Sequence, residues 1–188
     1  MNLLTAKYRK SRAKKAASYI IPWVEEGEKV LDFGCGDMLV AEEVVKKKKV
    51  KIQGIDVINI NETDLPYLQY QGDRIPFKDN SFDVTYASYV LHHTPDVEFF
   101  VKECLRVSRR RVILLEDVFT NRAEQLLVKG CDYGNMFISR EMNMALNFKS
   151  VQGWMALFGT LGVKRVETVP IRPAFLKPTR HRMFVLDV

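Results

Sequence analysis

Short apolar runs alternate with helical patterns along most of the chain. Five runs have the length and composition of strands, at residues 29–34, 51–56, 67–71, 82–87 and 110–116. Helical patterns lie between several of these runs, at residues 39–48 and most clearly at residues 96–107, which follow a Thr-Pro pair. Alternating strands and helices predict an α/β fold with a parallel sheet that is covered on both faces.

The C-terminal third departs from this alternation. Residues 163–169 and 183–186 read as two strands joined by a proline-rich connection, and we expect them to pair as an antiparallel edge. Residues 131–149 are rich in methionine and aromatic side chains and show no clean period. This segment either covers a substrate or fills the core, as such side chains often do.

The first 21 residues predict a basic amphipathic helix. Small and apolar residues recur at helical spacing from Ala13 to Ile21, and Pro22 ends the pattern. Residues 7–15 carry six positive charges without an acid, whereas the rest of the chain holds 23 basic and 23 acidic residues. Such a run either contacts phosphates or anionic substrates or is the solvated face of the helix.

Composition narrows the class of protein. The 188 residues suit one domain over 1–188, and no apolar run approaches the roughly 20 residues of a membrane span. The N-terminus lacks the pattern of a secretory signal. The three cysteines, Cys35, Cys104 and Cys131, are far apart without metal-binding or redox spacing, so we expect free thiols, no metal and a cytoplasmic location.

Two strand ends carry candidate ligand-binding residues. Gly34 and Gly36 follow the first strand, where a ligand can approach a backbone that lacks Cβ atoms. Asp56 ends the next strand, 20 residues beyond Gly36, and a carboxylate there can accept both hydroxyls of an adenosine ribose. The alternatives are a tight turn and a solvated strand-end acid.

Two more motifs complete an ordered set: residues 72–77, after the third strand, and residues 81–93, which form the fourth strand and its exit loop. With these four motifs the chain resembles the class I S-adenosylmethionine-dependent methyltransferases, particularly the type 11-like group that methylates small molecules such as quinone precursors. The resemblance runs from about residue 30 to residue 117. It implies a Rossmann-like, doubly wound, mostly parallel seven-stranded sheet with an antiparallel C-terminal edge strand.

The resemblance also implies the residues that bind S-adenosylmethionine, which leaves as S-adenosylhomocysteine. Asp32 would brace the turn whose residues line the methionine part, Asp56 would hold the ribose, and Asp73 would hold the adenine amino group. The full set that it implies is Asp32, Gly34, Cys35, Gly36, Asp56, Val57, Asp73, Arg74, Ile75 and Ser88, with Arg74 and Ile75 flanking the adenine.

The chain departs from the family pattern at Met38, where a third glycine is usual. A side chain there could crowd the amino-acid end of the cofactor. A nicotinamide cofactor fits less well, because the dinucleotide fingerprint requires glycine at the position of Leu39.

Several side chains near the strand ends are candidates for the methyl-transfer step. His93 is our candidate general base, needed only if the accepting atom must lose a proton; the alternative is that it packs against the following helix. Glu116, followed by Asp117, ends the fifth strand and could orient an acceptor or be solvated. Tyr8, with Arg12, could cap the site from the N-terminal helix, whereas we expect His181 to be structural.

The sequence therefore predicts a methyltransferase that acts on a small-molecule acceptor. Two alternatives stay open. One is methylation of RNA or of a protein through the basic residues 7–15, and the other is a non-catalytic module that only binds S-adenosylmethionine. The acceptor and the oligomeric state cannot be read from the sequence.

Overall fold

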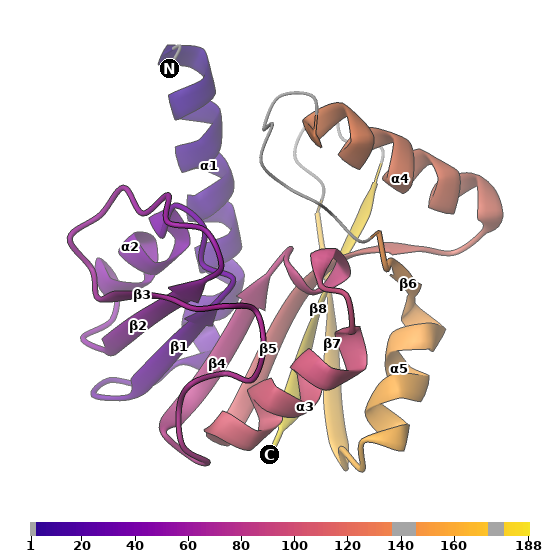
Figure 1. Cartoon of the computed structure of the whole chain (residues 1–188). Coiled ribbons are helices and arrows are strands. Elements are labelled where there is room, and N and C mark those ends of the chain that lie inside the picture. The colour runs from indigo at the N-terminus through magenta and orange to yellow at the C-terminus, as the bar shows by residue number, and fades with distance from the viewer. Residues whose placement is uncertain (1–2, 137–145, 173–178) are drawn as a thin grey trace.

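A computed structural model describes residues 3–136, 146–172 and 179–188 of the chain. Its centre is a twisted sheet in which seven strands follow the order β3-β2-β1-β4-β5-β8-β7 (Figure 1). The strands on this path are β1 (Lys29–Phe33), β2 (Lys51–Asp56), β3 (Tyr67–Gln69), β4 (Phe82–Ser88), β5 (Ser108–Phe119), β7 (Arg165–Ile171) and β8 (Arg180–Asp187). The two-residue strand β6 (Lys149–Ser150) pairs with the end of β5.

The sheet has a parallel core and an antiparallel C-terminal part, as the sequence predicts. Strands β1 to β5 pair in parallel, so their carboxyl ends meet at one edge. Strand β8 runs antiparallel to β5 and to β7, which lies outermost. The order of the central strands reverses direction at β1 and β4, and ligands bind at such a switch point in doubly wound sheets.

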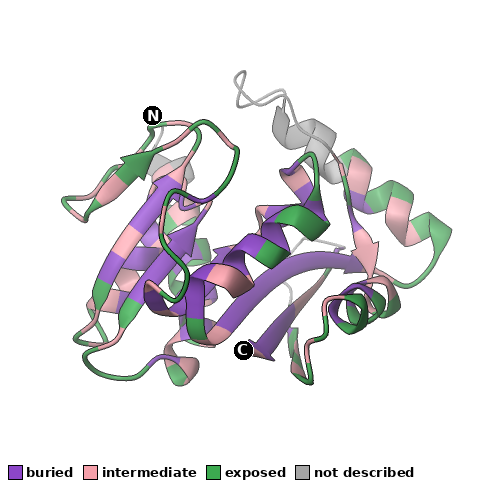
Figure 2. Ribbon diagram, turned by 60° about the horizontal axis from the view of Figure 1, so that its bottom comes forward, coloured by how far each residue is buried: buried purple, intermediate pink, exposed green. Residues whose placement is uncertain are grey.

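Helices cover both faces of the sheet. Helices α1 (Leu3–Ile20) and α2 (Leu39–Val45) pack on one face, and α3 (Val97–Val107) and α5 (Val151–Thr160) pack on the other. Helix α4 (Arg122–Met136) follows β5 beyond the carboxyl edge, and the short 3-10 helices are η1 (Ile21–Trp23) and η2 (Leu91–His93). Figure 2 shows the buried residues concentrated in the strands and on the inner helix faces.

Local sequence determines where these helices begin and end. The Asp96 carboxylate accepts a 2.9 Å hydrogen bond from the Phe99 amide at the start of α3, so Asp96 is the N-cap there, rather than the preceding Thr-Pro pair. Ser150 caps α5 in the same way by accepting a bond from Gly153. Pro22 lies in η1, directly after α1, as predicted.

The N-terminal helix has the predicted amphipathic arrangement. Its small and apolar side chains, Ala13, Ala16, Ala17 and Ile20, are buried against the sheet face that also holds α2. Their short side chains let the helix approach closely, which brings its first half to the carboxyl edge of the sheet (Figure 1). None of the described helices is both long and apolar enough to cross a membrane.

The segment at residues 131–149 divides into three parts. Residues 131–136 belong to the end of α4, residues 137–145 lie outside the described part of the chain, and the remainder leads into β6. Phe148 is buried and stacks on His92 with ring centroids 4.5 Å apart. In this last part, therefore, the aromatic side chain fills the core.

Substitution of Phe158 tests the packing of α5 on the sheet. Its ring is fully buried and lies 5.7 Å from the Trp154 ring and 5.4 Å from the Phe184 ring. We expect Phe158→Ala to lower the free energy of unfolding by about 3–5 kcal/mol, measured by chemical denaturation, because it leaves a cavity between these rings. Met155→Ala, on the exposed side of the same helix, is the control and should cost less than about 1 kcal/mol. Equal losses would contradict the packing.

Candidate active site

The turn after β1 requires glycine at Gly34. This residue has a φ of +67°, and a Cβ atom built on it would lie 2.2 Å from Cγ2 of Val90. The amides of Gly34 and Cys35 both donate to the Ile55 carbonyl, at 2.8 and 3.2 Å. The turn is thus held against the end of β2, with its backbone open toward the carboxyl edge.

Asp56 joins this turn from the end of β2. Its Oδ2 accepts a 2.8 Å hydrogen bond from the Gly36 amide, and its Oδ1 accepts a 2.7 Å bond from the Val57 amide. Oδ1 also accepts a 3.3 Å bond from the Ile58 amide, so three of the about four acceptor positions of a carboxylate are used and about one remains for a ligand hydroxyl. The predicted proximity of Asp56 to the glycine turn is confirmed.

Met38 does not crowd the turn, because its side chain points beneath it. The residue adopts a left-handed conformation with a φ of +60° and is fully buried. A Cβ atom on Gly54 would lie 2.5 Å from Cε of Met38 and 2.7 Å from its Sδ, so glycine at position 54 makes room for this side chain. The left-handed backbone explains why glycine is usual here, and the methionine occupies core space.

Asp32 forms a buried support under the turn. Its side chain accepts a 2.6 Å hydrogen bond from the hydroxyl of Tyr86 on β4. Burial raises the pKa of Asp32 to about 8, although the Tyr86 bond opposes this shift. Burial likewise raises the pKa of Cys35, so this thiol stays protonated.

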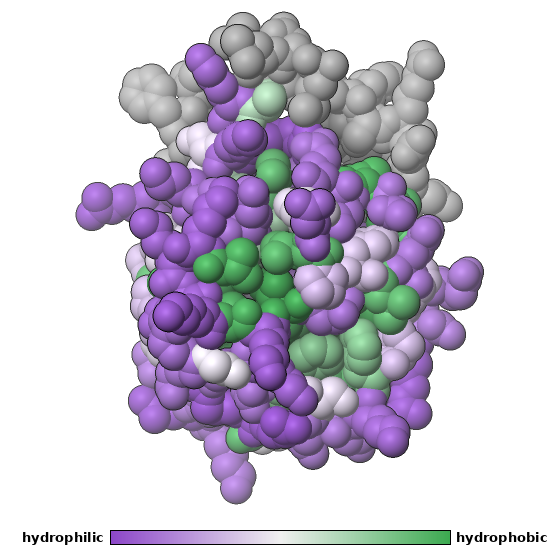
Figure 3. Space-filling model, turned by 90° about the vertical axis from the view of Figure 1, so that its left-hand side faces the viewer, coloured by the Kyte–Doolittle hydropathy of each residue, from purple (hydrophilic) through white to green (hydrophobic). Residues whose placement is uncertain are grey.

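Two adjoining cavities open at the carboxyl edge of the sheet. The larger, of about 520 Å³, is lined by residues that include Gly34, Asp56, Val57, Tyr70 and His93. The smaller, of about 260 Å³, lies against α1 and includes Asp32, Cys35, Gly36 and Ser88. Both are lined by Gly34, Gly36, Ile60 and Tyr89, so together they form one hollow. Val57 and Ile60 line the larger cavity and are exposed apolar residues. Figure 3 shows apolar side chains gathered on the face of the molecule that lies to the left in Figure 1.

Helix α1 forms a wall of the smaller cavity. Arg9 donates from Nε to Asp37 at 3.1 Å and from Nη1 to Glu62 at 2.9 Å, which ties the helix to the loops after β1 and β2. Arg12 and Ala13 line the cavity one turn further along. The predicted role of this helix as a cover is consistent with its position.

The two adjacent histidines have different surroundings. His92 is buried, and its Nδ1 lies 2.5 Å from Oε2 of Glu116, whose Oε1 accepts a bond from the Leu91 amide. Burial raises the pKa of Glu116, although the His92 contact opposes the shift. Glu116 has no exposed surface and lines neither cavity, so the structure does not place it where an acceptor binds. His93, by contrast, lines the larger cavity.

Tyr89 is a candidate that sequence reasoning missed. It lines both cavities and has a φ of +57°, a strained conformation for a tyrosine. Its amide donates to the Leu115 carbonyl at 2.8 Å, and its ring packs edge-on against His181 at 5.4 Å. The sequence carries no signal of such a backbone conformation at a residue other than glycine.

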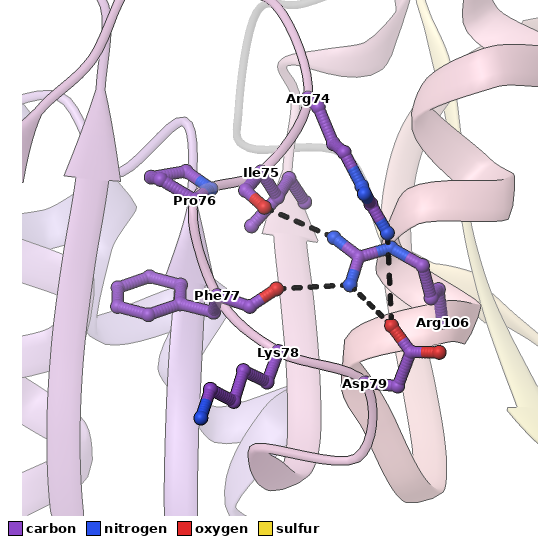
Figure 4. A pocket seen from close by; sticks show the side chains of 7 residues that line it. All are labelled: Arg74, Ile75, Pro76, Phe77, Lys78, Asp79 and Arg106. Atoms are coloured by element: carbon purple, nitrogen blue, oxygen red, sulfur yellow. Dashed lines mark hydrogen bonds and ion pairs between the residues drawn. The ribbon is translucent and has the colours of Figure 1, made fainter.

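The adenine-side residues are only partly brought together. Gly72 lines the larger cavity, whereas the neighbouring Asp73 is exposed and does not line it. Arg74 and Ile75 line a separate depression of about 620 Å³ (Figure 4). The side chain of Ile75 is buried in the core, and its amide donates to Glu103 at 3.0 Å. The structure therefore does not place Arg74 and Ile75 on the hollow.

Arg106 explains the course of this loop. Its guanidinium donates to the carbonyls of Ile75 and Phe77 at 3.0 and 2.9 Å and to the carboxylate of Asp79 (Figure 4). It also donates to the carboxylate of Glu103 on α3. These bonds draw the loop toward α3. The depression around Arg106 is therefore a feature of loop anchoring.

Tyr8 does not line either part of the hollow. It lies on a third, small cavity together with Arg12, Tyr89 and His181. Nδ1 of His181 contacts Oδ1 of Asp117, and both side chains are nearly buried. The structural role expected for His181 is thus consistent with this pair, although the ring also borders that cavity.

Comparison with known proteins identifies the family that the central part of the chain resembles. The family model described as "Methyltransferase domain" matches residues 31–115, which run from β1 to β5 and include the glycine turn, Asp56 and His93. This central stretch is a class I methyltransferase domain, of a family that depends on S-adenosylmethionine. Residues 31–115, which the family model matches, include most of the residues that line the hollow described above.

Curated relatives match about half of the chain. A sterol 24-C-methyltransferase of Gibberella zeae is 32% identical over 120 residues, which cover 52% of this chain and 31% of that protein. The 27-O-demethylrifamycin SV methyltransferase of Amycolatopsis mediterranei is 30% identical over 96 residues, or 44% of this chain and 35% of that protein. The matching regions thus span about a third of the length of these relatives.

Solved structures extend the similarity of fold to nearly the whole chain. A chain in the complex between the Haloferax volcanii Trm112 methyltransferase activator and a methyltransferase aligns with a TM-score of 0.73 at 16% identity, covering 96% of this chain and 92% of its own. A SAM-dependent methyltransferase from Aquifex aeolicus aligns with a TM-score of 0.66 at 16% identity, covering 95% and 97%. These matches establish the Rossmann-like methyltransferase fold.

The raised pKa of Asp32 predicts a pH dependence of stability. The folded protein keeps a proton on Asp32 that the unfolded chain releases near pH 4, so the free energy of unfolding should fall as the pH rises from about 4 to about 8. Asp32→Asn removes this contribution, and we expect its stability profile, measured by denaturation across this range, to fall less steeply than that of the wild type.

Asp83→Asn provides a control of opposite sign. The hydrogen bond from the Lys29 amide lowers the pKa of Asp83, and the bond from Arg109 lowers it further. The Asp83 carboxylate therefore contributes stability that is lost as the pH falls through its folded pKa. The variant should lose stability at neutral pH and little at low pH. Parallel profiles for wild type and Asp32→Asn would contradict the raised pKa of Asp32.

Proposed function

We propose that this protein transfers a methyl group from S-adenosylmethionine to a small-molecule acceptor. The observation that carries the proposal is the convergence of Asp56, the open glycine turn and the wall formed by α1 on one hollow. The volume of its larger part, about 520 Å³, lies in the range of ligand sites, roughly 300–1,000 Å³.

The residues of the hollow fit the chemical groups of this cofactor. Asp56 retains about one acceptor position for a ribose hydroxyl, and Gly34 and Gly36 leave room for close approach of the methionine part. Cys35 and Ser88 line the same region, and Val57 and Tyr70 provide apolar surface for the adenine. The neighbouring Asp73 is our candidate partner of the adenine amino group.

The bound cofactor supplies an activated methyl group on a sulfonium, and on transfer the C–S bond breaks with its electron pair remaining on sulfur. The protein must orient the acceptor in line with that bond, and orientation alone can lower a barrier by roughly 7–11 kcal/mol. Tyr89 and His93 line the hollow at the end of β4, where they can position an acceptor and exclude water.

A small-molecule acceptor is supported by the distribution of charge on α1. Arg9 is engaged with Asp37 and Glu62, and Arg12 and Lys15 line cavities. Among the basic residues 7–15, the three that are exposed and line neither cavity are Lys7, Lys10 and Lys14. Three positive charges are few for a surface that binds RNA. The names of the curated relatives, a sterol and a rifamycin methyltransferase, agree with a small acceptor.

The two alternatives can be separated experimentally. Binding of RNA should weaken steeply with rising salt, so a gel-shift titration without salt-sensitive association removes that version. Incubation with labelled methyl donor and a cell extract addresses the non-catalytic version, because label transfer to any acceptor excludes a purely binding role.

Substitution of Asp56 tests cofactor binding. We expect Asp56→Ala to weaken binding of S-adenosylhomocysteine, measured by calorimetry, by at least about ten-fold, because hydrogen bonds to a charged group contribute roughly 1.5–3 kcal/mol. Asp64→Ala, at an exposed acid of the following loop, is the control and should bind normally. Absence of binding by the wild type, or unchanged binding by Asp56→Ala, would contradict the proposed function.

Substitution of His93 tests its role as general base. With an acceptor found by label transfer, His93→Gln should lower kcat by roughly 100-fold or more while the affinity for S-adenosylmethionine stays unchanged. The acid limb of the pH profile of kcat/KM should disappear in the variant, since it reports protonation of the base. An unchanged kcat and pH profile would show that His93 only packs in the loop.

A further inference from the structure

A third cavity adjoins the smaller cofactor cavity beside α1. Its volume is about 40 Å³, and it shares Arg12, Ala16 and Tyr89 with the smaller cofactor cavity. It lies between α1 and the neighbouring ends of β7 and β8, which contribute Arg172 and His181. We refer to it as the basic pocket.

Positive charge dominates the lining of the basic pocket. Arg12 and Lys15 come from one side of α1, and Arg172 comes from the end of β7, where its amide donates to the Tyr19 hydroxyl at 3.2 Å. Asp117, which contacts the ring of His181, does not line the pocket. Within the described ranges no carboxylate pairs with any of the three cations, so the pocket can neutralise an incoming anion.

The cofactor itself accounts for only one of these cations. Arg12 lines both the basic pocket and the smaller cofactor cavity, so it can meet the carboxylate of the methionine part. Lys15 and Arg172 line the basic pocket alone. Two cations therefore remain for a second anionic group that the cofactor does not supply.

Tyr89 links the basic pocket to the site of methyl transfer. It lines all three cavities, and its ring is fixed edge-on against His181. Burial raises the pKa of its phenol, so its hydroxyl is neutral and can donate a hydrogen bond. Tyr89 therefore lies at the junction between the basic pocket and the two cofactor cavities.

We propose, building on the proposed function, that the methyl acceptor carries a carboxylate that binds between Lys15 and Arg172. Its accepting atom then lies past Tyr89, toward the cofactor. The size of the pocket favours a carboxylate, because about 40 Å³ is little more than the roughly 30 Å³ that one water molecule occupies in the liquid. A polyanion such as RNA would have to bind outside it.

The test uses the whole chain saturated with S-adenosylhomocysteine, and benzoate as the probe with neutral benzamide as its counterpart. Binding is followed by NMR shift titration. We expect benzoate to shift the amide resonances of Lys15, Tyr89 and Arg172, and benzamide to bind more weakly by about ten-fold. Lys15→Gln and Arg172→Gln should each weaken benzoate binding by about five-fold, since each loses a charge-assisted contact. Added salt should weaken it as well.

Two control variants carry the same charge change on the same elements. Lys14→Gln removes the exposed neighbour of Lys15 on α1, and Arg165→Gln removes an exposed arginine at the opposite end of β7. Both should bind benzoate like the wild type, and Lys15→Gln and Arg172→Gln should retain normal affinity for S-adenosylhomocysteine.

The proposal is overturned if benzamide binds as well as benzoate, if benzoate does not bind, or if the control variants weaken binding as much as Lys15→Gln and Arg172→Gln. Failure of S-adenosylhomocysteine to bind in the first step would instead contradict the proposed function. The two failures are thus distinguishable.

Discussion

The hydrogen bonds between the turn after β1 and the end of β2 are the constraint on which the site depends. The amides of Gly34 and Cys35 share the Ile55 carbonyl, and the Gly36 amide donates to Asp56. These bonds stop the turn from closing over the sheet edge, and they also orient the carboxylate that would hold a ribose. Because the same few atoms shape the turn and fix Asp56, the geometry of the ligand site is established by strand pairing before any ligand arrives.

Helix α1 completes this hollow by a different kind of interaction. Its buried alanine face packs on the sheet, while Arg9 reaches across to Asp37 on the glycine turn and to Glu62. The first half of the helix extends above the sheet edge (Figure 1), where Arg9 contacts the loops after β1 and β2. The Arg9–Asp37 pair is half-buried and the Arg9–Glu62 pair reaches the surface, where ion pairs contribute little, so this part of the helix can loosen more readily than the sheet beneath it.

Much of this fold could be predicted from sequence because its signals are local. Apolar runs gave the strands, and the spacing of Phe100, Val101 and Cys104 gave α3. Helices α4 and α5 were not predicted. Helix α5 is short and apolar on most of its surface, so its sequence lacks the polar positions that would reveal a helical period.

Asp56 was found because a motif places it, whereas Tyr89 becomes significant only through a left-handed backbone and contacts distant in sequence. Arg74 lies away from the hollow, on a separate depression, because Glu103 and Arg106 determine the course of its loop.

The basic N-terminal segment illustrates why charge in a sequence does not by itself identify a partner. Read along the chain, six positive residues suggest a surface for a polyanion. Wound into α1, they separate by helical position, because residues three apart share a face. Arg9, Arg12 and Lys15 follow that spacing and turn toward the carboxyl edge, where one forms ion pairs and two line the basic pocket. The remaining positive charges of residues 7–15, on Lys7, Lys10 and Lys14, are few. The folded protein therefore presents a small positive pocket of carboxylate size and not an extended basic surface.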